Sequence, residues 1–479
     1  MSLTGKRYLS HRGYAIEKEG NELLVEQLKK ELTVKPRTNP MMLQEEAKAF
    51  PVYRENQQKL YLPKNFGLDR LGVPDVIQME DGEDCPNLNF HGQLRPVQEE
   101  PVQAFLQATK DPKKMGGILS LCCGFGKTIL ALYFASYFKK KTLVVCHTQF
   151  LMDQWIERIE QYLPDAKTGK IKQDICQIKG TDIVIASLQS LAMRDYDAAI
   201  FKQFGFVVLD ECHHLGAEVF SRCLPKITCR KMLGLSATLK RKDGLSKVFE
   251  WHLGKPVFTI KRKDCEVKVL VERFYDPHPE YGRELKLWNT GKLNVARMIN
   301  KICEFPPRNY KIVQTLKKVM ETEPNRKVLI LSERRTHLQA LEALLKMENY
   351  SSIGYYVGGM SKQQLDEGST HDIILATFQL ASEAMDIPKL NTLILASPVS
   401  SIEQPIGRIQ RKKKEEREYI PLVIDLLDEF SIFERQGAKR IAFYKKNEYE
   451  IVDTVKEKES HQEKRRYCLI KDEDEEEAQ

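Results

Sequence analysis

The stretch that decides the fold reads Leu-Cys-Cys-Gly-Phe-Gly-Lys-Thr and occupies residues 121–128. Residues 116–121 form an apolar run of strand length that leads into it. Residues 129–138, which follow it, are rich in Leu, Ala, Tyr and Phe and contain neither Gly nor Pro, which predicts a helix. A strand that turns through glycines into a helix beginning at Lys-Thr is typical of a phosphate-binding loop, although the full motif has glycine where this chain has Leu121.

The residue types of this loop suit phosphate chemistry. Its two glycines allow backbone N–H groups to point inward, and the helix N-terminus adds partial positive charge. Lys127 is expected to reach the β- and γ-phosphates of ATP, and the Thr128 hydroxyl to hold Mg²⁺. The alternative is an ordinary glycine-containing turn. The residues expected to line the nucleotide phosphates are Cys123, Gly124, Phe125, Gly126, Lys127 and Thr128.

The composition favours a globular intracellular protein with a polyanionic partner. Apolar residues make up 42% and charged residues 30% of the 479 residues, a length that suggests roughly three domains. No run of 18 apolar residues occurs and residues 1–12 are polar, so we expect no membrane partner and no secretory signal. The eleven cysteines lack a C-x-x-C pair and are expected to be reduced. Residues 471–479 contribute −5 to the net charge of +8, so the remainder carries +13.

Two series of short apolar runs alternate with helical segments. Such runs, rich in β-branched residues, predict buried parallel strands joined by helices, and hence an α/β fold with two doubly wound sheets. The predicted strands are 117–121, 142–146, 182–186, 206–209 and 232–235, then 328–331, 353–357, 373–376, 392–396 and 422–424. The expected domains are a small accessory domain (1–88), a nucleotide-binding domain (89–272), a linker with a second α/β domain (273–455) and a charged, disordered acidic tail (456–479).

Two acidic residues follow one of these strands. Asp210 and Glu211 end the apolar run 206–209, and they come 83 residues after Lys127. Because α/β sheets bind ligands at the carboxyl ends of their strands, both carboxylates are expected beside the phosphate loop. Asp210 is expected to hold Mg²⁺, and Glu211 to orient or deprotonate the water that attacks the γ-phosphate. The alternative is that the two acids simply end a strand.

These residues carry a family resemblance. Asp210-Glu211-Cys212-His213 resembles the D-E-x-H box of superfamily 2 helicases, and residues 121–128 resemble their motif I, in the variant without the first glycine. Residues 404–411 match motif VI, Q-x-x-G-R-x-x-R, at every defined position. Seven elements follow the family's order across residues 94–411, which indicates membership. The other four of these elements are 94–98, 143–155, 185–189 and 236–238, the last of which is motif III. Residues 375–388 also resemble a family motif, motif V, with Ala384 where relatives commonly have Gly.

The resemblance implies two tandem RecA-like domains that bind ATP and Mg²⁺ between them. It implies that Gln98 reads the adenine, and that Arg408 and Arg411 act as arginine fingers on the γ-phosphate. The residues expected to couple hydrolysis to domain movement are Ser236, Thr238, His213 and Gln404.

Residues 234–244 indicate which group of the family the chain resembles. They are similar to the segment after motif III in the XPB group, and this similarity favours DNA as the substrate. The chain departs from that segment at Lys242, where the XPB group has a Glu. The compact length of the chain resembles that of a smaller branch of the family, which includes UvsW and the transcript-release helicases of poxviruses and other large DNA viruses. This implies a viral DNA helicase or translocase in transcription termination or repair. RNA polymerase or its transcription complex would be a partner, and the host cytoplasm, virus factory or virion the location.

Nucleic acid is expected to be gripped through its phosphates, independently of sequence and sensitively to salt. The residues expected to contact DNA are His147, Ser187, Arg241, Arg334 and Thr377, whereas Trp155 is expected to lie in the core. An RNA helicase would share every catalytic motif and stays open as an alternative. A nucleotide-binding scaffold without activity is a second alternative, against which the intact Lys127, Asp210 and Glu211 argue.

Overall fold

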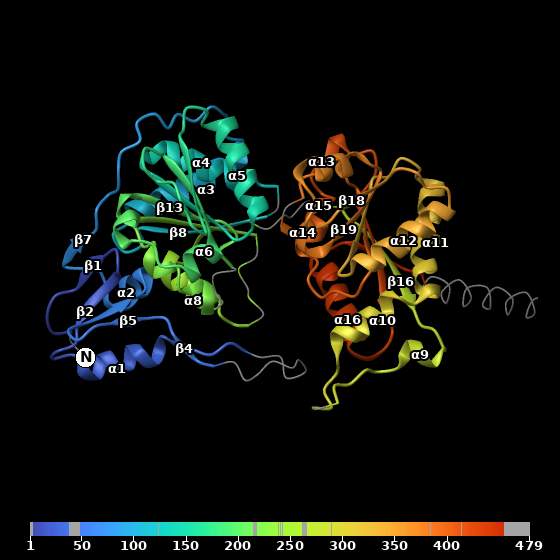
Figure 1. The fold of residues 1–479 in the computed structure, drawn as a ribbon, viewed down its shortest axis with the longest axis horizontal. Coiled ribbons are helices and arrows are strands. Elements are labelled where there is room, and N and C mark those ends of the chain that lie inside the picture. The colour runs from blue at the N-terminus through green and yellow to red at the C-terminus, as the bar shows by residue number, and fades with distance from the viewer. Residues whose placement is uncertain are drawn as a thin grey trace, which may run out of the picture. The chain divides into compact units, whose positions relative to one another are not determined.

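The computed structural model describes residues 3–37, 48–122, 124–213, 218–237, 239, 241, 243–260, 266–288, 290–383, 385–412 and 414–454. The chain divides into two compact units, with the division between Lys261 and Arg262 (Figure 1). The expected acidic tail 456–479 and the coupling residue Thr238 lie outside the described residues, as does Cys123 of the phosphate loop.

The first unit is built on an eight-stranded sheet in the order β11-β10-β12-β9-β13-β14-β8-β15. Strands β9, β12 and β13 are buried along their whole length, in keeping with their Val- and Ile-rich sequences. All neighbours pair in parallel except β10 and β11. The strands are β8 (Gly116–Leu121), β9 (Thr142–Cys146), β10 (Thr168–Lys172), β11 (Ile175–Cys176), β12 (Ile183–Ser187), β13 (Phe206–Leu209), β14 (Lys231–Ser236) and β15 (Pro256–Ile260).

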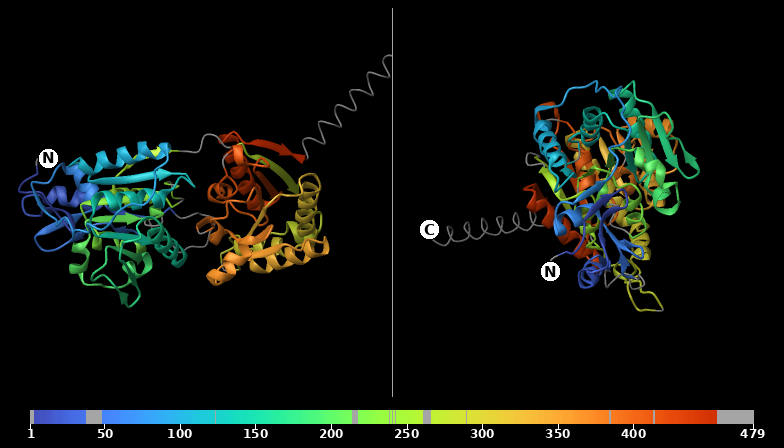
Figure 2. Two further views of the ribbon diagram at one scale, coloured as in Figure 1. Left: turned by 90° about the horizontal axis from the view of Figure 1, so that it is seen from above. Right: turned by 90° about the vertical axis from the view of Figure 1, so that its left-hand side faces the viewer.

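Helices cover both faces of this sheet (Figure 2). On one face, Phe105, Phe134 and Trp155 from three helices pack against strand residues such as Val144. On the other face, a second apolar cluster joins the remaining helices to the alternate strand residues, so the sheet is doubly wound as predicted. The first face carries α3 (Glu99–Lys110), α4 (Lys127–Phe138) and α5 (Gln149–Tyr162), and the second carries α6 (Leu188–Met193) and α8 (Ser246–Leu253).

The accessory domain forms a five-stranded sheet in the order β5-β6-β2-β1-β7. Two of its side chains fix it to the α/β domain of the same unit. Lys64, which is fully buried, donates to the carbonyls of Met115 (3.0 Å) and Cys229 (3.2 Å), and Asn65 donates to that of His252 (2.8 Å). Its elements are β1 (Tyr8–Ser10), β2 (Gly13–Glu17), α1 (Glu22–Glu31), β5 (Arg54–Glu55), β6 (Lys59–Leu62), α2 (Lys64–Leu71) and β7 (Val76–Gln78).

The second unit holds a seven-stranded parallel sheet in the order β18-β19-β17-β20-β21-β16-β22. Strand β16 (Lys268–Phe274) pairs with β21 and β22, so the predicted domain boundary at residue 272 is wrong and cuts through a strand of this sheet. The other strands are β17 (Val328–Ser332), β18 (Ile353–Tyr356), β19 (Ile373–Thr377), β20 (Thr392–Leu395), β21 (Leu422–Asp428) and β22 (Glu450–Asp453).

Two buried arginines brace the carboxyl end of this second sheet. Arg308 pairs with Asp428 (2.6 Å) and donates to a backbone carbonyl just after β20. Arg440 forms a second buried ion pair, with Asp425 (2.9 Å). The helices are α9 (Pro279–Gly282), α10 (Val295–Cys303), α11 (Pro306–Thr322), α12 (Arg335–Met347), α13 (Lys362–Thr370), α14 (Phe378–Glu383), α15 (Glu403–Arg408) and α16 (Ser431–Lys446).

Two expectations from composition can be compared with the structure. In the part of the chain that the structure describes, no helix is long and apolar enough to cross a membrane. The cysteines within the described residues are free thiols, as expected, and most of them are buried.

Candidate active site

The phosphate loop joins β8 to α4, as predicted. Gly124 has φ +77° and Gly126 has φ +93°, a region of backbone conformation that favours glycine. A Cβ added at Gly124 would meet no atom within 4 Å, so this side of the loop is open. A Cβ at Gly126 would lie 2.5 Å from Gln98 Nε2. The loop is therefore open where a phosphate would approach and tightly packed on its other side.

Gln98 and Arg95 hold the loop from behind. The Gln98 side chain is 1% exposed, donates to the Phe125 carbonyl (2.8 Å) and accepts from the Arg95 N–H (2.9 Å). The Arg95 guanidinium also donates to the Phe125 carbonyl and lies 5.9 Å from the Phe125 ring centroid. Both ends of the Gln98 amide are thus engaged, and its role in reading adenine stays a prediction. The contribution of Arg95 was not foreseen from the sequence.

A continuous line of polar side chains runs from the phosphate loop to β14. Lys127 Nζ donates to Glu211 Oε1 (2.6 Å), and both side chains are 14% exposed. Glu211 Oε2 lies 3.4 Å from His213 Nδ1, which is 2.9 Å from the Ser236 hydroxyl. The structure therefore brings together Lys127 of motif I, Glu211 and His213 of the D-E-x-H box, and Ser236 of the segment 236–238. We call the line from Lys127 through Glu211 and His213 to Ser236 the relay.

The charges in the relay set the protonation of its carboxylate. Burial by itself would raise the pKa of Glu211, but the Lys127 ammonium and then His213 lower it well below its usual range. Glu211 also has φ +45°, a backbone conformation that few non-glycine residues adopt. Glu211 is therefore held ionised beside the phosphate loop.

Asp210 is fixed by two N–H donors. Its Oδ2 accepts from the Trp155 indole N–H (2.9 Å) and its Oδ1 accepts from the Glu211 backbone N–H (3.0 Å). Burial, and then the neighbouring Glu211 carboxylate, raise the pKa of Asp210. Trp155 is 1% exposed, so the expectation that it lies in the core is confirmed. Its hydrogen bond to Asp210 was not foreseen, since the sequence does not show which way the indole N–H points.

Thr128 and Asp210 supply the oxygen ligands that Mg²⁺ prefers. Each Asp210 oxygen accepts one N–H and keeps lone pairs for water or a cation. The described residues contain no group of three or more His, Cys, Asp and Glu side chains that could enclose a metal. The residues present suit Mg²⁺ brought with a nucleotide.

The arginines of motif VI lie within the second unit. Arg408 is 8% exposed and donates to the Met385 carbonyl (2.6 Å). Arg411 donates to the same carbonyl (2.9 Å) and forms an ion pair with Asp386. Both guanidinium groups are thus held by the loop that carries motif V. Gln404 is half-buried near the beginning of α15, and its coupling role stays a prediction.

The five residues predicted to contact DNA differ in exposure. His147 and Ser187 are each 8% exposed, and the Ser187 hydroxyl caps α6. Arg241 donates to the His213 carbonyl and to Asp243 (2.9 Å). Arg334 Nε donates to Asn300 Oδ1 (2.6 Å). Thr377 is half-buried at the end of β19. In this conformation two of the five residues, His147 and Ser187, are buried, and the contact of the set with nucleic acid stays a prediction.

Comparison with known proteins gives matches for both units. Residues 91–241 match the family model described as type III restriction enzyme, res subunit. Residues 311–413 match the helicase conserved C-terminal domain. Each model lies within one of the two α/β domains.

Known proteins resemble the chain along most of its length. A putative ATP-dependent RNA helicase of Acanthamoeba polyphaga mimivirus is 34% identical over 93% of this chain and 86% of its own length. A protein with a similar description from African swine fever virus is 28% identical over 70% of this chain and 69% of its own. The structure of T4 UvsW matches over 90% of this chain and 96% of its own, with 20% identity and a TM-score of 0.34. With these two family models and a relative that is 34% identical over most of both chains, this chain belongs to the superfamily 2 helicases, which hydrolyse ATP and act on nucleic acid.

Proposed function

We propose that this protein is an ATP-dependent DNA helicase or translocase that serves a large DNA virus in transcript release, transcription termination or repair. The observation that carries the catalytic part is the relay. Lys127 donates to Glu211 Oε1 at 2.6 Å, Glu211 Oε2 lies 3.4 Å from His213 Nδ1, and His213 lies 2.9 Å from the Ser236 hydroxyl. RNA polymerase or its transcription complex is the proposed protein partner, and the host cytoplasm or virus factory the proposed location.

The residues of the first unit can exchange partners when a nucleotide arrives. Without nucleotide, Lys127 neutralises Glu211. A triphosphate in the loop competes for the Lys127 ammonium, which frees a Glu211 oxygen to orient a water molecule. Bound Mg²⁺ would neutralise phosphate charge, and Thr128 and Asp210 would hold it. His213 stays beside Glu211 and transmits the change to Ser236 at the end of β14.

Arg408 and Arg411 are proposed to stabilise the charge that develops on the leaving γ-phosphate. In the structure they bind the Met385 carbonyl and Asp386. A phosphate group is a stronger partner for a guanidinium than a backbone carbonyl, so these contacts can be exchanged. In this proposal the arginines connect the state of the nucleotide to the motif V loop.

Trp155→Phe tests whether Asp210 needs its indole donor. The substitution keeps an aromatic ring in the core but leaves Asp210 Oδ2 without its partner at 2.9 Å. We expect the Mg²⁺ concentration for half-maximal ATPase to rise by roughly 10–100-fold, the usual cost of removing a group that orients a metal ligand. Trp251→Phe on α8 is the matched control, and its Mg²⁺ dependence should equal that of the wild type. An unchanged Mg²⁺ dependence in Trp155→Phe would assign the indole to packing alone.

The alternative substrate is RNA. It is favoured by the descriptions of both viral relatives, each of which is called a putative ATP-dependent RNA helicase. DNA is favoured by the similarity of residues 234–244, which include Arg241, to the corresponding segment of the XPB group. Since the catalytic residues are the same for both, only a substrate comparison separates the two.

The experiment is steady-state ATPase with no polynucleotide, single-stranded DNA, duplex DNA and RNA. We expect DNA to stimulate turnover and binding to weaken steeply with salt, because phosphate contacts release counterions. Stimulation by RNA alone, or equal stimulation by both, would move the proposal to the RNA alternative. Absence of ATPase under all four conditions would favour the inactive scaffold.

A further inference from the structure

A hairpin between α9 and α10 of the second unit carries the most exposed tryptophan of the chain. The Trp288 side chain is 97% exposed, whereas Trp155 is 1% exposed and Trp251 is half-buried. In Figure 1 the chain between α9 and α10 extends outward from the helices of this unit. Single exposed apolar residues are common on protein surfaces, so exposure alone assigns no role to the indole. The conformation and the charge of the hairpin, however, limit what the indole can contact.

The hairpin presents Trp288 on an ordered turn. The Leu287 N–H donates to the Lys292 carbonyl (2.8 Å), and the Leu287 carbonyl accepts from the Gly291 N–H (2.9 Å). Gly291 has φ +66°, which closes the turn in a conformation that favours glycine. Leu285 in the stem packs against the apolar core of the second unit. The stem is therefore fixed to the domain, while the indole at the tip has almost no contact with its own chain.

The hairpin and α10 form a cationic segment. Residues 285–303 contain four cations, among them Lys286 and Lys292, and no acidic residue. Lys286 and Lys292 are exposed and flank Trp288 on the two arms of the hairpin. Cations on both sides of an aromatic ring match a single strand of nucleic acid, in which each base lies between two phosphates. A protein partner would have to supply acids for the same ammonium groups.

The hairpin begins and ends at the carboxyl edge of the second sheet. On the α9 side, the Tyr281 hydroxyl donates to Asp428 Oδ1 at the end of β21 (2.8 Å). On the α10 side, Asn300 Oδ1 accepts from Arg334 Nε, just after β17 (2.6 Å). Parallel α/β sheets bind ligands at this edge, and Arg334 is one of the residues predicted to contact nucleic acid. Trp288 thus stands at the same edge as a predicted nucleic-acid contact.

We propose that Trp288 stacks on an unpaired base of the polynucleotide, while Lys286 and Lys292 bind the phosphates on either side of that base. Such stacking tolerates any sequence, because every base presents a π-face. The inference rests on membership of the helicase family, which acts on nucleic acid, and not on the choice between DNA and RNA. It adds a contact with a base to the phosphate contacts of the proposed function.

The test is a binding cycle with the full chain and no nucleotide. Fluorescence anisotropy gives the Kd of labelled oligothymidylate, of oligouridylate and of an abasic oligomer of the same length. Trp288→Ala should weaken binding of the first two by roughly 5–150-fold, the effect of losing one base–aromatic stack. It should leave binding of the abasic oligomer unchanged, since no phosphate contact is lost. Trp288→Phe keeps an aromatic ring and should retain most of the affinity.

Met347→Ala is the matched control. It removes an exposed apolar side chain of the same unit, at the end of α12. Its affinity for all three oligomers should equal that of the wild type.

The indole also reports the contact directly, because a stacked base quenches tryptophan fluorescence. We expect oligothymidylate to quench the emission of the wild type and of Trp251→Phe. Trp288→Phe should bind the oligomer without this quenching. Lys286→Met should lower the slope of log Kd against log salt by roughly 0.7, the value for one phosphate contact on a single strand, and should leave the quenching at saturation unchanged.

Two results would overturn the proposal. One is equal affinity of Trp288→Ala and the wild type for oligothymidylate and oligouridylate, which would favour a protein partner for the indole. The other is an equal loss of affinity on the abasic oligomer, since the indole would then act without a base. Because binding is measured without ATP, a chain that binds through Trp288 but lacks ATPase would refute the proposed function and not this inference.

Discussion

Lys127→Ala is expected to lower ATP turnover by at least roughly 10²–10³-fold, the cost of removing one group that stabilises developing charge. Lys127 is the cation of the phosphate loop and the partner of Glu211 at 2.6 Å. The substitution removes the charge that holds the β- and γ-phosphates, and it leaves Glu211 with only His213 at 3.4 Å. Steady-state ATPase with saturating polynucleotide, together with thermal unfolding followed by circular dichroism, measures both activity and fold.

The fold should survive this change. Lys127 is the first residue of α4, and its ammonium contacts a carboxylate and not the apolar core. Loss of the ion pair should raise the pKa of Glu211, because the largest charge that lowers it is gone. Lys113→Ala, in the exposed turn after α3, is the matched control and should retain full activity. Near-normal ATPase in Lys127→Ala would refute the assignment of the phosphate loop.

Much of the nucleotide site could be predicted from the sequence, because its residues follow strand ends. Lys127, Asp210 and Ser236 each come at or just after a short apolar run, and parallel strands bring such positions to one sheet edge. The structure confirms the two doubly wound α/β sheets. What joins these residues, however, is side-chain direction. The hydrogen bonds of Trp155 and Arg95 depend on which way an indole and a guanidinium point, and spacing alone does not show this.

Several strands escaped prediction for an identifiable reason. Strand β16 contains Lys268, Glu272 and Arg273, so it does not read as an apolar run. Glu272 is nevertheless 7% exposed, because β16 pairs with β21 and β22 from the far end of the chain. Partners about 150 and 180 residues away decide that this segment is a strand, and local sequence contains no sign of them. The predicted domain boundary at residue 272 lies too late in the chain because β16 was not recognised as a strand.

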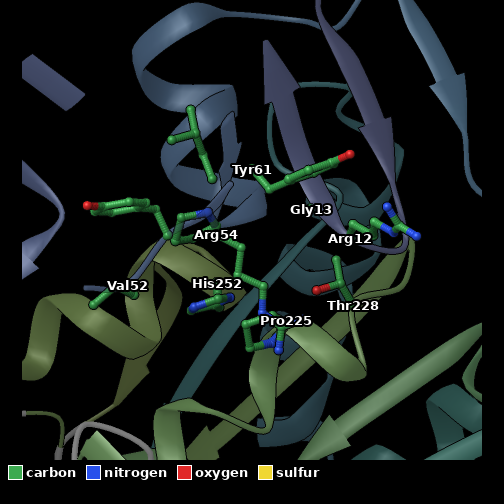
Figure 3. Close-up of a pocket in the computed structure, with 11 residues that line it drawn as sticks. Arg12, Gly13, Val52, Arg54, Tyr61, Pro225, Thr228 and His252 are labelled. Atoms are coloured by element: carbon green, nitrogen blue, oxygen red, sulfur yellow. The ribbon is translucent and has the colours of Figure 1, made fainter. Parts of the chain in front are cut away.

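The accessory domain is a further example of structure that could not be predicted from the sequence. Its sequence shows no chemical motif, since Arg12, Arg54 and His252 are isolated residues far apart in the chain. Only the folded sheet places the first two beside α8 of the larger domain. Folding also buries His252 to 3% exposure, and its Nε2 has no hydrogen-bond partner within the described residues. The pocket that these residues line (Figure 3) is invisible to motif searches because no segment of sequence contains it.

Arg411→Ala is expected to separate nucleotide binding from turnover. The residues that hold ATP in the first unit remain, so affinity for ATP should change little. Turnover should fall on the order of 10³-fold or more if Arg411 acts as an arginine finger. Binding of DNA without nucleotide should hardly change. Equilibrium binding of a fluorescent ATP analogue, steady-state ATPase and a DNA titration on the same purified variant measure the three quantities.

Two rival roles of Arg411 predict other results. Arg411 pairs with Asp386, so it could act only by holding the motif V loop. Asp386→Ala breaks the same ion pair but keeps the guanidinium, and it should therefore reproduce the full loss of turnover only under this rival. Arg411 could also serve merely as the first cation of the basic segment 411–414, in which case Lys412→Ala should weaken DNA binding as strongly as Arg411→Ala. The finger role requires that Arg411→Ala alone lose turnover by three orders of magnitude, since only that variant removes the charge that the transition state needs.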